Sequence, residues 1–137
     1  MRGKVSSRIE GVATISLALD ERTWSAIDAI GVAEEGHLEF FRLHDKTSGD
    51  IWQDEYFLPV EIPIGHVVQA EVDIINDSSY DLAGTLTVEF IDPDGNSRGK
   101  RSFSYSAISP GDQRGVTTNE VTLDKDGTWK IHAKFEI

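Results

Sequence analysis

The stretch that decides the fold is residues 128–137, TWKIHAKFEI, at the end of the chain. Apolar and polar side chains alternate along it without exception. One face carries Trp129, Ile131, Ala133, Phe135 and Ile137, and the other carries Lys130, His132, Lys134 and Glu136. A period of two predicts a β-strand with one face in a core and the other in water.

Three upstream runs, residues 66–76, 83–91 and 100–107, repeat this alternation, and turn-forming sequences separate them. In the turn at residues 92–96, Pro93 suits the first central position and the following Gly95 a left-handed one. Residues 116–123 are predicted to form a further strand. Strands at this spacing, joined by such turns, predict an all-β, antiparallel sandwich.

Within each run the apolar side chains fall on one face of the strand, so we predict that these faces meet in a single core. Its members are Val72, Val88, Phe90, Trp129, Ile131 and Phe135.

The N-terminal half is less regular. Residues 12–19 read as a strand whose inward side chains are Ala13, Ile15, Leu17 and Leu19. Asp20 is a candidate N-cap for one short helix that carries Trp24, Ile27 and Ile30 on one stripe and ends at Gly31.

Two further strands are predicted at residues 38–43 and 56–64, with a loop at 45–50 between them. Pro59 and Pro63 cannot donate to a strand ladder, which favours an edge position for the second strand. No internal repeat or linker divides the chain. We therefore predict one domain over residues 1–137, with an N-terminal extension and extra strands at 1–55 and an immunoglobulin-like sandwich core at 56–137.

Composition excludes several classes of protein. The 137 residues include no cysteine, which rules out disulfides, thiol catalysis and cysteine-bound zinc. A net charge of −11 repels phosphate backbones, so no nucleic-acid partner is expected. Apolar runs are far shorter than the ~20 residues of a membrane span, and no apolar signal-peptide core follows Arg2 and Lys4. We expect no membrane insertion.

The acidic turn at Asp92, Asp94 and Asn96 places oxygen ligands at alternate positions and is a weak calcium candidate. An EF-hand needs glycine at its sixth position and glutamate at its twelfth, whereas Gly95 is fourth here and Phe103 twelfth. A plain hairpin turn is the preferred interpretation. The four histidines are dispersed and are read as surface residues whose charge changes near pH 6. The prediction is no metal and no cofactor.

Three tryptophans raise the question of sugar binding, because aromatic rings stack on sugar rings. Trp129 lies on the core stripe, and Trp24 shares the stripe of the predicted helix. Trp52 lies between Ile51 and Gln53, close in sequence to three acidic residues and Tyr56. Trp52 and Tyr56 are therefore the candidate ligand-binding pair. No nucleophile elbow, phosphate-binding loop or zinc-protease helix is present, so no catalytic residue is assigned and an enzyme is not expected.

From residue 58 onward the chain resembles immunoglobulin-like sandwich modules of microbial and viral surface proteins, close to fibronectin type III and CARDB-like domains. The residues that carry the resemblance are Val68-x-Ala70-x-Val72-x-Ile74, then Val88-x-Phe90-x-Asp92-Pro93-Asp94-Gly95, Ile108-x-Pro110-Gly111, and Leu123-x-x-x-Gly127-x-Trp129-x-Ile131. Antibody-type domains have a cysteine pair that this chain lacks. The resemblance implies a spacer, adhesin or assembly subunit.

The expected function is therefore a non-catalytic structural or interaction sandwich, a virion or cell-surface assembly subunit whose partner is protein, including self-association through edge strands. The alternative is a carbohydrate-binding module with a glycan ligand at Trp52 and Tyr56. An unpaired apolar strand is unfavourable in water, so residues 1–19 are expected to pair with their own sheet or with a neighbouring molecule's sheet.

Overall fold

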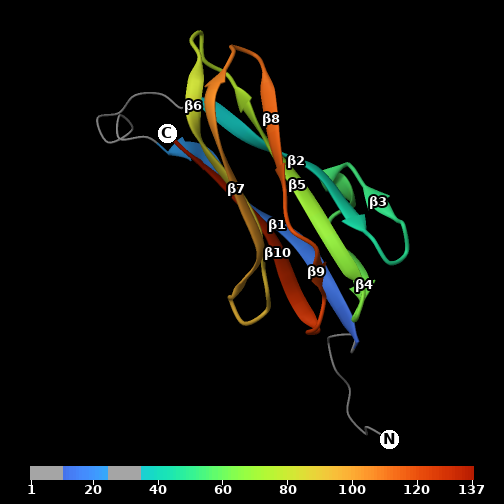
Figure 1. Cartoon of the computed structure of the whole chain (residues 1–137). Helices are drawn as coiled ribbons and strands as arrows, with labels where there is room; N and C mark the ends of the chain where they lie inside the picture. The colour runs from blue at the N-terminus through green and yellow to red at the C-terminus, as the bar shows by residue number, and fades with distance from the viewer. Residues whose placement is uncertain (1–10, 25–34) are drawn as a thin grey trace, which may run out of the picture.

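The computed structural model describes residues 11–24 and 35–137, and almost all of its regular structure is β-strand (Figure 1). The elements are β1 (Val12–Trp24), β2 (Gly36–Asp45), β3 (Ile51–Trp52), the 3-10 turn η2 (Glu55–Phe57), β4 (Val60–Pro63), β5 (Val67–Asn76), β6 (Leu82–Ile91), β7 (Ser97–Ile108), β8 (Gln113–Thr117), β9 (Val121–Thr122) and β10 (Gly127–Glu136).

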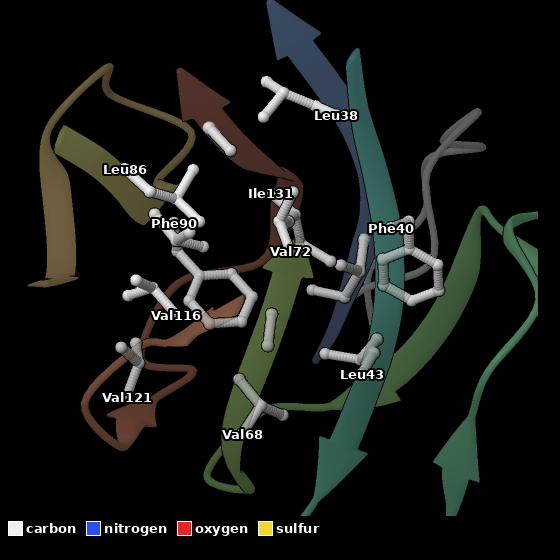
Figure 2. Close-up of a cluster of buried hydrophobic side chains, with 14 of the residues drawn as sticks. Leu38, Phe40, Leu43, Val68, Val72, Leu86, Phe90, Val116, Val121 and Ile131 are labelled. Carbon is white, nitrogen blue, oxygen red and sulfur yellow. The ribbon is translucent and has the colours of Figure 1, made fainter. Parts of the chain in front are cut away.

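The strands form two sheets. The first has the order β4-β1-β10-β6-β7, and the second has the order β3-β2-β5-β8, with β9 paired to β5. Side chains from both sheets meet between them, as Phe90, Val72 and Ile131 do in Figure 2. This arrangement confirms the predicted all-β sandwich. The strand pairs are antiparallel as predicted, except that β1 and β10 pair in parallel.

All six side chains predicted to form the core are completely buried. Trp129, Ile131, Phe135, Val88, Phe90 and Val72 each have a relative exposure of 0%. The strands at 66–76, 83–91 and 128–137 are therefore in the predicted phase. Ile137 was predicted on the inward face but is 47% exposed, because it lies beyond the end of β10. The pattern weakens in β7, where Phe103 is 55% exposed because this strand is the outer edge of its sheet.

The N-terminal strand lies inside its own sheet. β1 pairs antiparallel with β4 and parallel with the C-terminal strand β10, in a register that places Ile15 opposite Trp129. Ala13 and Ile15 are fully buried, as expected for the inward side. β1 therefore pairs within its own chain over residues 12–19 and again at Thr23 and Trp24.

The helix predicted from Asp20 is wrong at its start, because β1 continues to Trp24 and remains paired with β10 there. The ladder is irregular between Leu19 and Thr23, and pairing with β10 then resumes at Thr23 and Trp24, so strand pairing outweighs the local capping signal. The other predicted helix positions, Ile27, Ile30 and Gly31, lie outside the described residues.

Two other predicted strands are shorter than expected. The 56–64 strand begins only at Val60, because Asp54 accepts a hydrogen bond from the Tyr56 amide and starts η2 instead. β4 is an edge strand, as its prolines indicated. The 116–123 strand divides into β8 and β9 around Thr118, whose hydroxyl accepts a hydrogen bond from the Ala70 amide.

Candidate functional site

The candidate site is a groove beside an uncovered stretch of β1. β4 pairs with β1 only over Val12–Ile15, whereas β1 itself continues to Trp24. Within the described part of the chain, no strand pairs with this side of β1 beyond Ile15. The backbone of an uncovered strand presents unpaired N–H and C=O groups that can template another strand.

The groove has a volume of about 580 Å³ and both apolar and acidic walls. It is lined by Ser16, Leu17, Asp54, Glu55, Tyr56, Leu58 and Pro59. It exists because the chain before β4 turns away from β1 into η2, which leaves a space where β4 would otherwise have continued. The Tyr56 ring is 85% exposed at the rim and meets Phe57 edge-on, with ring centroids 6.1 Å apart.

Both charged residues that line the groove, Asp54 and Glu55, are acidic, while Lys130 lies beside Ser16 on the neighbouring strand β10. Residues 50–63 include Asp50, Asp54, Glu55 and Glu61, all exposed, and no lysine or arginine. Carboxylates gathered in this way create a local negative potential that favours a cationic ligand.

The structure separates the two residues predicted to bind a ligand together. Tyr56 lines the groove, but Trp52 lies opposite Leu43 in the β2–β3 ladder and packs partly buried against the core. Sequence reasoning missed Ser16, Leu17, Leu58 and Pro59. No local signal marks them, because their meeting depends on where β4 separates from β1.

The predicted weak calcium turn is occupied by the protein's own groups. Asp92 Oδ1 accepts hydrogen bonds from the amides of Asp94 and Asn96, and Asp92 Oδ2 contacts Lys125 Nζ at 3.1 Å. Lys125 also reaches Asp94 at 2.7 Å. Burial alone would raise the pKa of Asp92, but these hydrogen bonds and one from Arg98 hold it well below its usual range.

The same turn is joined to the core. Arg98 bridges Asp92 and Asp124 and stacks over the Trp129 ring, 5.2 Å from the ring centroid. The Trp129 indole N–H donates to the Lys125 carbonyl at 2.8 Å. The acidic residues of this turn therefore hold the loops at one end of the sandwich together.

We expect chelation to leave stability unchanged. In the described residues, no three His, Asp or Glu side chains gather as metal ligands, and ammonium and amide groups already satisfy Asp92. The melting temperature in EDTA should equal that in added calcium, measured by circular dichroism at physiological ionic strength. A drop of several degrees in EDTA that calcium restores would identify the Asp92 turn as a real site.

Three of the histidines pair with carboxylates. His37 contacts Asp77 at 2.7 Å and Glu39 at 2.9 Å, and these hydrogen bonds raise the pKa of His37. His66 contacts the buried Asp45, and His132 contacts Glu89. Burial opposes ionisation of Asp45 and Glu89, but hydrogen bonds from these histidines and nearby hydroxyl or amide groups lower both pKa values.

Two carboxyl groups lie close together on the face of the second sheet that points away from the core. Glu71 and Asp73 both lean over Gly115, where an added Cβ would collide with Glu71 Oε2 and Asp73 Oδ1. Asp73 is only 4% exposed, and its Oδ1 has no hydrogen-bond donor among the described residues. Burial and the neighbouring Asp73 raise the pKa of Glu71 to about 7. A proton shared between the two carboxyl groups would supply the missing donor.

Because the folded protein holds this proton more tightly than the unfolded chain, Glu71 should destabilise the fold as pH rises from about 4.5 to about 7. Replacing Glu71 with Gln, which keeps a donor without a charge, should remove this part of the pH dependence. The check is the urea midpoint of both proteins from pH 5 to pH 8. The exposed Glu61→Gln is the matched control, and equal slopes for all three proteins would contradict the shared proton.

No known protein family matches this chain, and neither a curated protein sequence nor a solved structure matches it. Within the described residues, none of the helical segments is long and apolar enough to cross a membrane. The geometry of the groove is therefore the basis for a functional assignment.

Proposed function

We propose that the protein is a non-catalytic structural or interaction β-sandwich that acts as an assembly subunit of a virion or cell surface. The observation that carries this proposal is the stretch of β1, beside the acidic groove, with which no described strand pairs. Such an edge offers backbone hydrogen bonds to an extended segment, and the adjoining pockets select its side chains.

The pairing of the buried charged groups supports a structural role for them. Asp45, Glu89 and Asp92 each contact a histidine or a cation, and they connect neighbouring turns and strands. These contacts satisfy side chains that would otherwise be costly to bury.

Self-association tests this proposal. Sedimentation velocity from micromolar to submillimolar protein should show species larger than a monomer, and their fraction should rise with concentration. Added salt should weaken the association, because it screens attraction to the carboxylates around the groove. A monomer at every concentration and salt level would contradict self-assembly.

A carbohydrate-binding module is the second candidate, and the exposed Tyr56 ring is the observation that favours it. Tyr56 stands beside Asp54 and Glu55, so an aromatic platform and hydrogen-bond acceptors line one groove. A glycan array would test this candidate. Signals lost in Tyr56→Ala and kept in Phe103→Ala, another exposed aromatic residue, would support a sugar ligand at the groove.

A further inference from the structure

We infer that the groove binds residues 1–10 of a second copy of this chain as an added strand beside β1, which links the copies head to tail. This inference rests on the proposed function and names the segment that mediates assembly. Residues 1–10 themselves lie outside the described part of the structure.

The groove is in the position that an added strand would occupy. β1 is covered on this side by β4 up to the pair Ile15–Val60, and the groove begins at the next two residues, Ser16 and Leu17. A strand here would continue the line of β4 and pair with β1 backbone groups that no described strand engages. The groove would also bury side chains against Leu58 and Pro59.

The sequence of residues 1–10, MRGKVSSRIE, has the matching pattern. In an extended conformation Val5 and Ile9 fall on one face, and Arg2, Lys4 and Arg8 fall on the other together with Glu10. One face can thus pack on the apolar wall of the groove while the other meets its acidic rim. At about 3.3 Å per residue the segment is long enough to lie along the groove and still reach a neighbouring molecule.

The positive charge of residues 1–10 explains why this segment suits the acidic groove better than most of the protein surface does. Two copies with a net charge of −11 repel each other, so their contact needs a locally cationic element. The strand β7 also carries basic residues and no acidic ones. Its Arg98, however, already forms ion pairs with Asp92 and Asp124, and the backbone amide of Asn119 donates a hydrogen bond to the carbonyl of Gly99.

An exchange of this kind is heterologous. Each copy would donate its N-terminal segment and accept that of another, and such contacts make open filaments unless rotation closes a ring. The donated strand completes the sheet of its neighbour without requiring a large apolar patch on either molecule.

Two full-length variants test the two sides of the contact separately. The donor variant carries Arg2→Glu, Lys4→Glu and Arg8→Glu. The groove variant carries Glu55→Lys and Tyr56→Ala and keeps Asp54, which caps η2. We expect each variant alone to associate at least about tenfold more weakly than the wild type in sedimentation velocity. A mixture should form a one-to-one pair, because the intact donor of one fits the intact groove of the other.

Lys100→Glu with Arg101→Glu on β7 is the matched control for lost positive charge, and it should assemble like the wild type. Circular dichroism establishes that each variant is folded. In addition, a synthetic peptide of residues 1–10 should shorten wild-type assemblies by occupying free grooves.

The outcomes separate this inference from the proposed function. If the wild type associates and the donor variant does so equally well, or if the β7 control alone abolishes association, the inference is wrong while an assembly role stands. If the mixture of donor and groove variants forms no pair, the donor–groove contact is wrong. A wild type that remains monomeric overturns both.

Discussion

Phe90→Ala should lower the free energy of unfolding by about 3–5 kcal/mol. Phe90 has a relative exposure of 0%, and its ring lies between the two sheets, where Figure 2 shows Val72, Val116 and Ile131 around it. Removing the ring loses its transfer free energy and leaves a cavity that the neighbouring strands fill only in part.

Urea denaturation of the wild type and of Phe90→Ala measures this loss directly. Phe103→Ala is the matched control, because it removes the same atoms from a ring that is 55% exposed on β7. It should change the free energy of unfolding by less than about 1 kcal/mol. Similar losses for both variants would show that the assigned strand phase is incorrect.

Gly84→Ala should also be strongly destabilising, by about 1–3 kcal/mol or more. A Cβ on Gly84 would lie 2.5 Å from the Glu136 carbonyl oxygen and 2.5 Å from the Phe135 ring. Phe135 is fully buried and Glu136 belongs to the neighbouring strand β10, so neither can move away without disturbing the β6–β10 ladder. The added methyl group therefore has to push two paired strands apart.

A double-mutant cycle with Phe135→Leu tests this cause. If the ring is part of the collision, the loss of stability in Gly84→Ala with Phe135→Leu should be less than the sum of the two single losses. Strict additivity would mean that the ring takes no part in the effect. A neutral Gly84→Ala would show that this approach of β6 and β10 is looser than the structure indicates.

Local alternation was sufficient to predict the strands of the C-terminal half and the core residues they share. The period of two in β5, β6 and β10 is a property of the chain itself, and burying one face of each strand requires a second sheet. The turn at residues 92–96 was likewise predictable, since Pro93 and Gly95 have restricted or unusual backbone preferences.

The residues of the candidate site were only partly predictable from the sequence. Tyr56 was identified from its polar and acidic neighbours and does line the groove, whereas Trp52 shared those neighbours and packs against the core. The difference comes from β3, which pairs Trp52 with Leu43 and so removes it from the groove. The residues adjacent to Trp52 in the sequence do not indicate that it pairs with Leu43.

The sequence by itself determined that this protein is a β-sandwich and identified six of the side chains in its core, because alternation and turn chemistry are local properties of the chain. Only the tertiary structure decided that β1 joins the C-terminal strand in parallel, that it overrides the Asp20 capping signal, and that no described strand covers its edge beyond Ile15. Strand pairing is a contact between distant segments, and its register depends on how both faces of the sheet are buried at once. The groove, and any partner that it binds, follows from that pairing.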